Sequence, residues 1–356
     1  MPKILFLLPY PMEKAPSQRF RVELFFQVLN AQKIDYKVRS FIDKKTWIIL
    51  YDGKGKFAKS WGVIKGLFKR VFTLLFQSWR YNYVFIHREA APIGPPVFEW
   101  ILSKLMGKKI IYDFDDAIWI PNTSTENKSV SWLKASWKVK YICKWAYKVV
   151  GGNDYLCAFA KQYNKNVIMI PSCVDTVYGH SRLKDHQTGK PVVGWTGSHS
   201  SLQYLENIVP IIKELQRNYE FCFAVIADKK PLINLDDWVF IPWNADSETD
   251  DLLKIDIGLM YLPVDAWSEG KCGFKLIQYL SLGIPAIASP VGVNKIIVEQ
   301  GINGYLCDTA MEWKAALLKL LTDVSLRKKM GLAGRRKILQ QYSIASQEIK
   351  YLGLFN

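Results

Sequence analysis

The sequence lacks several features that would assign it to a membrane-spanning, metal-binding or disulfide-rich class. In its 356 residues, no apolar run approaches the roughly 18–20 residues needed to span a bilayer. The six cysteines form no C-x-x-C pair and no cluster with histidine, so we expect reduced, buried thiols. Only four histidines occur, so a metal site built from a histidine cluster is not expected.

Positive charge, by contrast, is in excess. The chain carries 48 Lys and Arg against 32 Asp and Glu, a formal net charge of +16. Such an excess predicts an anionic partner, and the candidates are nucleoside diphosphates, lipid headgroups, phosphorylated acceptors and nucleic acids. The sequence contains no recognition-helix motif and no stacking-sheet signature, so nucleic acid is not expected among the partners.

Strand-like and helix-like segments alternate along the whole chain and predict an α/β fold of doubly wound parallel sheets. The expected strands cover residues 3–8, 34–40, 83–86, 109–112, 147–151, 167–170, 191–195, 221–226, 238–241, 256–260, 285–289 and 304–307. The expected helices cover residues 18–31, 62–79, 95–106, 130–145, 154–163, 200–217, 247–253, 273–282, 293–299, 310–322 and 325–341. With 49% hydrophobic residues, the chain can build two domains that each have a core. We expect domains at 1–178 and 190–341, joined by the polar segment 176–190.

One segment carries a pattern that suits a phosphate group. Residues 268–280 read Ser-Glu-Gly-Lys-Cys-Gly-Phe-Lys-Leu-Ile-Gln-Tyr-Leu, a glycine-containing loop that runs into a short helix, and an apolar strand follows Pro285. The unpaired N–H groups and the dipole of a helix N-terminus favour an anion there. Lys271 and Lys275 would add positive charge, and Gln278 could reach a ribose hydroxyl. An ordinary loop–helix–strand unit with solvated lysines is the alternative.

The segments that follow make this pattern more specific. The strand is followed by Pro-Val-Gly-Val-Asn at 290–294, and residues 301–306 read Gly-Ile-Asn-Gly-Tyr-Leu. Together with 268–289, they resemble the C-terminal domain of family 4 glycosyltransferases, retaining enzymes of the GT-B fold. The resemblance covers residues 190–340 well and the N-terminal half more loosely. It implies two Rossmann-like domains that face each other across a cleft, with the final segment 342–356 crossing back to the first domain.

Two departures from the family pattern shape the expected donor site. The family signature is Glu-x7-Glu, but Gln278 stands in place of the second Glu, and Glu269 lies nine residues before it. The family's Arg and Lys after the first strand of this domain are absent as well. The resemblance therefore implies a divergent, metal-independent site in which backbone amides and lysines hold the diphosphate of a UDP- or GDP-linked sugar. Glu269 would contact the donor sugar. The implied donor-binding residues are Gly194, Thr196, Gly197, Ser198, Trp243, Lys271, Cys272, Gly273, Phe274, Lys275 and Gln278.

Two patches in the first half follow expected strands and would lie on the acceptor side. Ser17 and Arg19 come after the first strand, where Ser17 could cap a helix and Arg19 could meet a phosphate. A plain helix start with surface arginines is the alternative. His87 and Arg88 end the third expected strand, and we expect them to border the same cleft.

A run of carboxylates, Asp113-Phe-Asp-Asp116, directly follows the strand expected at 109–112. Carboxylates at the end of a buried strand are costly unless they are solvated, paired or functional. Related glycosyltransferases have a residue near this point that touches the donor sugar, so Asp115 and Asp116 are candidate catalytic residues. Pairing with Arg88 is the structural alternative. Asp113 and Asp115 also form an Asp-x-Asp pair, but it lies far from the donor loop in sequence, and no metal is expected there.

Residues 54–80 combine cations with bulky apolar side chains at helical spacing. The apolar members are Trp61, Ile64, Phe68, Phe72, Leu75, Phe76 and Trp79, and the basic ones are Lys54, Lys56, Lys59, Lys65, Lys69 and Arg70. This composition is typical of an interfacial helix on an anionic membrane surface, where each basic residue contributes about 1 kcal/mol. Segment 132–148 could extend the same face. The alternative is that the apolar stripe packs on the sheet while the lysines are solvated.

Together these patterns predict a cytoplasmic glycosyltransferase that is peripheral on the inner face of the plasma membrane. It would move a sugar from a nucleotide diphosphate sugar to a hydroxyl of a glycan or lipid-linked acceptor, with retention of anomeric configuration. The expected product is a surface polysaccharide or lipopolysaccharide. A nucleotide-sugar epimerase on the same fold and a non-catalytic relative are the alternatives. The non-catalytic alternative rests on the departures from Glu-x7-Glu.

Overall fold

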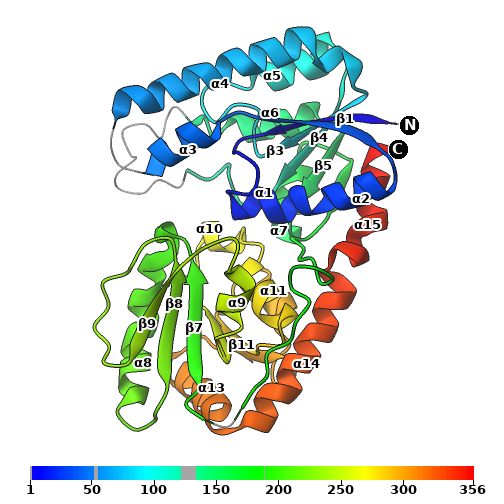
Figure 1. The fold of residues 1–356 in the computed structure, drawn as a ribbon. Coiled ribbons are helices and arrows are strands. Elements are labelled where there is room, and N and C mark those ends of the chain that lie inside the picture. The colour runs from blue at the N-terminus through cyan, green and yellow to red at the C-terminus, as the bar shows by residue number, and fades with distance from the viewer. Residues whose placement is uncertain (1, 52–54, 122–133, 188) are drawn as a thin grey trace. The chain divides into compact units, whose positions relative to one another are not determined.

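The computed structural model describes residues 2–51, 55–121, 134–187 and 189–356. The chain forms two compact units, Met1–Ser172 with Gln347–Asn356, and Cys173–Ser346 (Figure 1). Within the described residues, each unit contains one six-stranded parallel sheet with helices packed on it. The expected α/β class with two doubly wound units is therefore confirmed.

The sheet of the first unit has the strand order β2-β1-β3-β4-β5-β6. Its strands are β1 Lys3–Leu8, β2 Asp35–Ser40, β3 Tyr83–His87, β4 Lys109–Phe114, β5 Lys148–Gly151 and β6 Val167–Met169. Each lies where a strand was expected, but β4 is longer than expected because Phe114 still pairs with Gly151 of β5. The strand order reverses between β1 and β3. In an open parallel sheet, the carboxyl ends of the strands at such a reversal are the usual place for a ligand.

Helices cover this sheet, and their boundaries differ from expectation at several points. They are α1 Pro16–Arg21, η1 Glu23–Phe25, α2 Phe26–Ala31, α3 Lys44–Tyr51, α4 Lys56–Phe76, η2 Ser78–Arg80, α5 Val97–Trp100, the π-helix η3 Ile101–Leu105, α6 Lys138–Trp145 and α7 Asp154–Lys161. The single helix expected at 18–31 is wrong, because the chain leaves helical geometry at the buried Val22. Helix α3 was not expected, although Asp43 marks its start by accepting the Thr46 N–H at 2.9 Å.

The C-terminal segment returns to the first unit. It forms α15 Ile344–Leu352 and η6 Gly353–Phe355, and the residues from Gln347 onward belong to that unit. Tyr351 is buried and stacks on Phe25 with ring centroids 4.1 Å apart. The expectation that the last segment packs on the first domain is therefore met by these contacts.

The sheet of the second unit has the order β12-β11-β10-β7-β8-β9 and reverses between β7 and β10. Its strands, again where expected, are β7 Val192–Gly197, β8 Cys222–Ala227, β9 Trp238–Pro242, β10 Ile257–Met260, β11 Ala286–Ala288 and β12 Gly304–Leu306. Its helices are η5 His199–Tyr204, α8 Leu205–Gln216, α9 Glu248–Leu252, α10 Ala266–Glu269, α11 Phe274–Ser281, α12 Asn294–Ile297, α13 Ala310–Thr322 and α14 Val324–Gln341. Among these, α10 was not expected.

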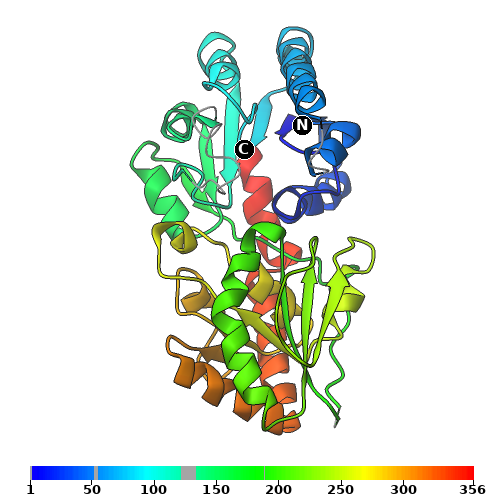
Figure 2. The ribbon, with the colours of Figure 1, turned by 90° about the vertical axis from the view of Figure 1, so that its left-hand side faces the viewer.

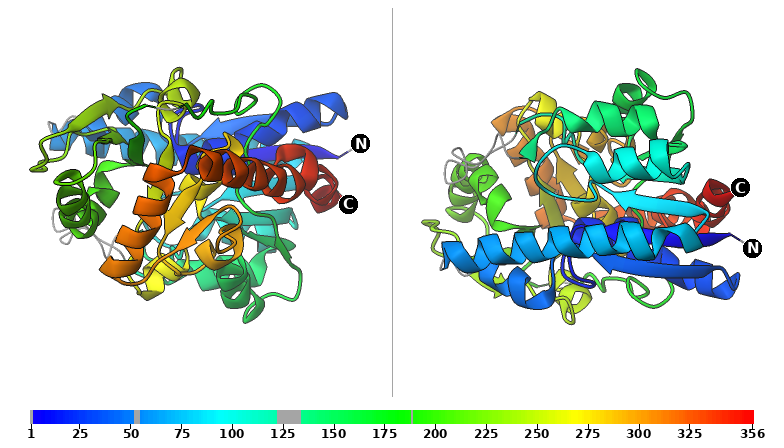
Figure 3. Two further views of the ribbon diagram at one scale, coloured as in Figure 1. Left: turned by 90° about the horizontal axis from the view of Figure 1, so that it is seen from below. Right: turned by 90° about the horizontal axis from the view of Figure 1, so that it is seen from above.

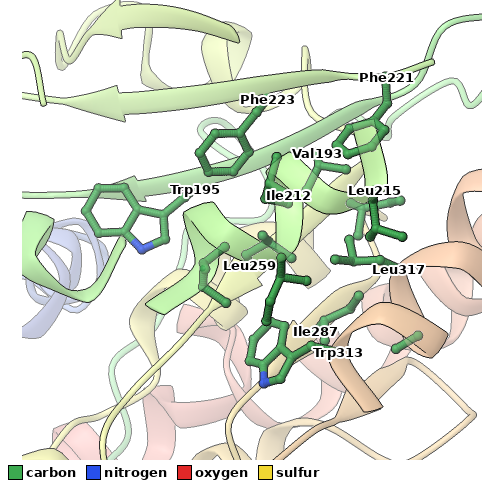
Figure 4. Close-up of a cluster of buried hydrophobic side chains, with 14 of the residues drawn as sticks. Val193, Trp195, Ile212, Leu215, Phe221, Phe223, Leu259, Ile287, Trp313 and Leu317 are labelled. Atoms are coloured by element: carbon green, nitrogen blue, oxygen red, sulfur yellow. The ribbon is translucent and has the colours of Figure 1, made fainter. Parts of the chain in front are cut away.

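Alternate residues of the central strands supply two cores, one on each face of this sheet. Val193 and Trp195 of β7 point to the face that α8 and α13 cover, where Trp313 completes the cluster (Figures 2 and 4). The opposite face packs on α11 and α14 through residues such as Ile226 and Leu276. A strand that is buried on both faces reads as an apolar run, which explains why these strands could be found from sequence.

Residues 176–190 were expected to link the domains, and this expectation is wrong for the described part of the segment. Arg335 of α14 donates hydrogen bonds to the backbone carbonyls of Thr176 and His180. His186 is buried and bonds the Gly283 carbonyl at 2.9 Å. The segment therefore packs inside the second unit, and its polar composition reflects these bonds to backbone groups.

Close packing of α14 on the loop after α11 gives a test of this unit. A Cβ atom at Gly331 would overlap the backbone carbonyl of Gly283. We expect Gly331→Ala to lower the free energy of unfolding by about 1–3 kcal/mol, because backbone cannot yield as a side chain can. The matched control is Gly353→Ala, whose Cβ would meet nothing within 4 Å. Urea unfolding of both variants checks this, and equal stabilities would contradict it.

Candidate functional site

Both units place polar side chains at the carboxyl ends of the strands where the strand order reverses. In the second unit these residues follow β7 and β10, and in the first unit they follow β1 and β3. This is the position where ligands bind in open parallel sheets. The two sets of residues are therefore described as two separate candidate sites.

The second-unit site is held together by contacts between β7 and α11. The backbone N–H of Thr196 donates to the Tyr279 hydroxyl at 2.9 Å. The Lys275 ammonium lies 4.1 Å from the centroid of the Trp195 ring, within the range of a cation–π interaction. The structure thus brings together the two segments, 194–198 and 271–278, that sequence reasoning assigned to donor binding.

Two of the expected donor-site glycines have packing roles that the sequence did not reveal. A Cβ at Gly194 would overlap the Ile255 side chain, and one at Gly197 would overlap the Trp195 ring. Ser198 follows Gly197, precedes the helix η5, and lies 2.9 Å from the Ser200 hydroxyl. The two glycines therefore make room for the Ile255 side chain and the Trp195 ring beside β7.

Lys275 is the most strongly perturbed cation of this site. Burial is the main cause, and the neighbouring positive charge of Lys271 adds to it; together they lower the pKa of Lys275 to about 7. Lys271 itself lies over the Trp267 ring at 4.8 Å. A lysine that is poised between its charged and neutral forms near neutral pH gains its full charge when an anion approaches.

The start of α11 presents backbone and buried polar groups. Gly273, in the left-handed region at φ 65°, precedes the helix, and no side chain caps the first turn. A Cβ at Gly273 would overlap Ile297. Gln278 is 4% exposed, and its Nε2 has no hydrogen-bond partner among the described residues. A buried donor without a partner is costly, so Nε2 could donate to a ligand hydroxyl, and the ribose contact stays a prediction.

The remaining expected donor residues lie around this junction. Glu269 ends the short helix α10, and its backbone carbonyl lies where a Cβ at Gly292 would approach to 2.9 Å. Cys272 is buried and Phe274 is partly buried against the α11 core. Trp243 follows β9, and its indole N–H donates to Glu248 at 3.0 Å. All of them therefore follow the carboxyl ends of strands in this unit, and their ligand roles stay predictions.

One pair at this edge was missed by sequence reasoning. Asp228, directly after β8, accepts both the backbone N–H and the Nδ1 of His199 at 2.6 Å. No motif links two residues 29 positions apart, so only the register of β7 and β8, which pairs Gly197 with Ala227, could have revealed them. The imidazole of His199 in this pair is half-exposed.

The first-unit site is a chain of hydrogen bonds that runs inward from Ser17. The Ser17 hydroxyl lies 2.9 Å from His87 Nε2, and His87 Nδ1 lies 2.7 Å from Asp113. Asp113 also forms an ion pair with Arg21, and the three inner side chains are buried. Nδ1 faces the Asp113 carboxylate and Nε2 faces the Ser17 hydroxyl, so the imidazole bridges these two groups.

Arg88 organises the two candidate catalytic carboxylates. Its Nε donates to Asp115 at 2.9 Å and its Nη2 to Asp116 at 2.8 Å. Burial acts to raise the pKa of Asp115, but Arg88 and then His87 outweigh it and hold that pKa well below its usual range. Arg88 has φ 60°, a conformation that non-glycine residues rarely adopt and that is frequent at functional sites. The pairing foreseen as an alternative is therefore present.

Arg19 and the Asp-x-Asp pair, also named from the sequence, lie in the first unit as well. The Arg19 guanidinium lies 4.9 Å from the Phe20 ring on α1. Asp113 of the Asp-x-Asp pair is engaged by Arg21 and His87, so its carboxylate belongs to the buried network. In the parts of the chain that the structure describes, no group of three His, Cys, Asp or Glu side chains is arranged to hold a metal ion.

The second unit also matches a known family. Residues 185–337 match the model of the glycosyl transferases group 1 family. The match covers less than half of the chain, so it shows that the second unit is similar to this family. Its boundaries enclose both β7 and α11, so the site built by Thr196, Lys275 and Gln278 lies within the matched segment. Transferase activity is accordingly the class of reaction that this family carries.

Individual known proteins are similar at lower identity. N-acetyl-alpha-D-glucosaminyl L-malate synthase of Bacillus anthracis is 25% identical over 125 residues, which span 35% of this chain and 31% of that relative. Sucrose-phosphate synthase from Thermosynechococcus elongatus has a TM-score of 0.71 at 13% identity, over 100% of this chain and 98% of the other. Anabaena HepE, solved with UDP and glucose, has a TM-score of 0.64 at 13% identity, over 99% of both chains. At such identities these solved structures show the fold, which is GT-B, as expected.

Removing one partner of the buried ion pair between Arg21 and Asp113 should be costly. We expect Asp113→Asn to lower the free energy of unfolding by about 3–5 kcal/mol, because it leaves the buried Arg21 charge uncompensated. The matched control is Asp250→Asn, which breaks an exposed pair with Arg182 and should cost under about 1 kcal/mol. Urea unfolding measures both. Similar small losses would mean that Arg21 is not held as a buried cation.

The lowered pKa of Lys275 predicts a specific pH dependence. Between pH 7 and about 10 the unfolded chain holds a proton on Lys275 that the folded chain has released, so this residue makes stability rise with pH. We expect Lys275→Met to remove this contribution to the rise of stability with pH. The free energy of unfolding of the variant, relative to that of the wild type, should therefore be greatest at pH 6 and should decline toward pH 10. Urea unfolding at pH 6, 8 and 9.5 tests this. A difference that does not vary with pH would contradict it.

Proposed function

We propose that the protein is a retaining glycosyltransferase that transfers a sugar from a UDP- or GDP-linked donor to an acceptor hydroxyl. The observation that carries this proposal is the junction of β7 and α11 inside the matched segment. There, the Lys275 ammonium sits against Trp195, and Nε2 of the buried Gln278 lacks a partner among the described residues. These groups match a nucleoside diphosphate, which offers anionic oxygens and ribose hydroxyls.

In this proposal the chain's own groups stabilise the departing diphosphate. The uncapped first turn of α11 points N–H groups at the phosphates, and Lys275 and Lys271 supply positive charge as negative charge develops. Gln278 would bind the ribose and Glu269 the donor sugar, with Trp243 near the base. The lysines would take the part that a metal ion has in other glycosyltransferases, so we propose a metal-independent reaction.

The proposed acceptor side is the first-unit site. The carboxylates of Asp115 and Asp116, fixed by Arg88, and the hydroxyl of Ser17, fixed by His87, offer several hydrogen-bond acceptors to sugar hydroxyls. We propose a glycan or lipid-linked acceptor and a product that belongs to a surface polysaccharide or lipopolysaccharide. The site of action would be the cytoplasmic face of the plasma membrane. None of the six cysteines, all within the described residues, forms a disulfide, which agrees with a reducing compartment.

A non-catalytic relative is the second candidate. Its support is the amide of Gln278 in place of the family carboxylate, together with the engagement of Asp115 and Asp116 by Arg88. Such a protein would bind the nucleotide sugar without transferring the sugar. Binding and turnover must therefore be measured separately.

A thermal-shift panel of UDP, GDP, ADP and CMP, with and without EDTA, tests the donor site. We expect one of UDP and GDP to raise the melting temperature equally in both conditions, because ligand binding to the folded state stabilises it. Lys275→Met should abolish the shift, since it removes the cation beside the diphosphate. Lys328→Met, on the exposed part of α14, is the matched control and should leave it intact.

The outcomes separate the candidates. No shift with any nucleotide would contradict the donor site, and a shift that EDTA removes would contradict metal independence. Where a nucleotide binds, NMR of the product formed from the matching α-linked sugar donor should show an α-linkage. A β-linked product would contradict retention, and binding without product from a range of glycan acceptors would favour the non-catalytic candidate.

A further inference from the structure

Helix α4 packs closely on its own unit through two glycines, while most of its large apolar side chains face outward. The inward side carries Gly62, Gly66, Arg70 and Thr73, spaced three or four residues apart, so they share one face. A Cβ at Gly62 would overlap the Thr46 side chain, and one at Gly66 would come within 2.6 Å of the Phe41 ring. The two glycines therefore let α4 pack closely on its own unit.

Arg70 fixes this orientation. It is 2% exposed, and its guanidinium donates to the backbone carbonyls of Leu8, Arg39 and Ala90 at 2.6–2.7 Å. Arg70 was expected among the basic residues that accompany the apolar stripe at a membrane surface, and that expectation is wrong for Arg70 because it is buried. Rotating α4 so that its apolar face turned inward would break these three hydrogen bonds and leave a buried cation without partners. The outward orientation of the apolar face is therefore a fixed feature of the fold.

The outward face consists of aromatic and aliphatic side chains that would ordinarily form a core. Their exposure ranges from 41% to 85%, and they are Phe57, Trp61, Ile64, Phe68, Val71, Phe72, Leu75, Phe76 and, just after the helix, Trp79. Helix α5 contacts α4, and α5 and the η3 that follows it carry three more exposed apolar residues, Val97, Trp100 and Leu105 (Figure 3). We call this set the α4 face. An exposed apolar patch of this kind marks an interaction site.

All charged side chains of helix α4 itself are positive. Helix α4 contains no Asp or Glu, and Lys59, Lys65 and Lys69 lie along it. Asp43, on the adjoining loop, pairs with Lys65 at 2.8 Å and Lys69 at 3.7 Å. Arg80 lies over the Trp79 ring at 5.0 Å, at the far end of the face. The surface thus combines exposed aromatics with flanking cations.

The second basic stretch, 132–148, contributes less than expected. Lys138 is buried and paired with Glu89, and Lys148 bonds the carbonyls of Gly353 and Leu354. These two lysines are therefore structural. Trp137 and Tyr141 are exposed on α6, whereas Trp132 lies outside the described residues. The α4 face is accordingly the main apolar and basic surface of this region.

We propose that the α4 face inserts in the plane of an anionic lipid bilayer, with its aromatic side chains at the level of the headgroups. Aromatic residues favour that interface, and the flanking lysines complement anionic headgroups. In the part of the chain that is described, no helix has the length and apolar character needed to cross a bilayer, so contact would be lateral. A second copy is a poorer occupant, because pairing two such helices would place like charges together. The proposal does not depend on transferase activity.

Vesicle sedimentation of the full chain tests the proposal. We expect binding to vesicles of phosphatidylglycerol and phosphatidylcholine, weaker binding at high salt, and much weaker binding to phosphatidylcholine alone. The double variant Phe68→Ser, Phe72→Ser should bind about tenfold more weakly or worse, since both side chains are exposed and would lose their lipid contact. Leu232→Ser, at an even more exposed apolar residue of the second unit, is the matched control and should bind as the wild type.

Three results would overturn the proposal. One is equal vesicle binding by the double variant and the wild type at unchanged melting temperature. Another is equal binding to neutral and anionic vesicles. The third is a stable dimer in gel filtration without lipid that the double variant converts to a monomer, because the α4 face would then be an interface between copies. Lys65→Gln, Lys69→Gln adds a variant that keeps the apolar face and should weaken binding only to anionic vesicles.

Discussion

The contact between helix α11 and the central strands is the constraint on which the donor site depends. Gly194 of β7 and Gly258 of β10 pair directly across the strand reversal. A Cβ at Gly258 would overlap the Tyr279 ring, so the glycine lets that ring lie flat on the sheet. Tyr279 then reaches the Thr196 N–H, and the same helix carries Lys275 to the Trp195 ring. One close approach of helix to sheet therefore places the backbone, the cation and the buried amide of the site.

In the first unit, ion pairs rather than close packing fix the positions of the site residues. Three carboxylates, Asp113, Asp115 and Asp116, follow one another at the end of β4, and two guanidiniums, Arg21 and Arg88, neutralise them. His87 connects the buried pair to Ser17 at the surface. Ion pairs of this kind add little net stability, but each partner holds the others in a single geometry. Such a network is suited to presenting hydrogen-bond acceptors at fixed positions.

The sequence could reveal the strands because strands buried on both faces are apolar runs that end at turn residues, as β3 and β8 are. It could not reveal the break at Val22 or the direction of α4. Helical periodicity shows that a stripe exists, but not that Gly62, Gly66 and the carbonyl partners of Arg70 turn that stripe outward. Likewise the spacing of Lys271 and Lys275 indicated a phosphate site, whereas the ring of Trp195 beside Lys275 came from a strand about 80 residues away. Only the folded chain shows that contact.

The most direct test of the account is a crystal structure of the chain with the nucleoside diphosphate that stabilises it. We expect the diphosphate at the first turn of α11, within hydrogen-bond distance of Lys275 Nζ, and the ribose hydroxyls at the Gln278 amide. A nucleotide bound at any other place in the chain would contradict the claim that the junction of β7 and α11 is the donor site.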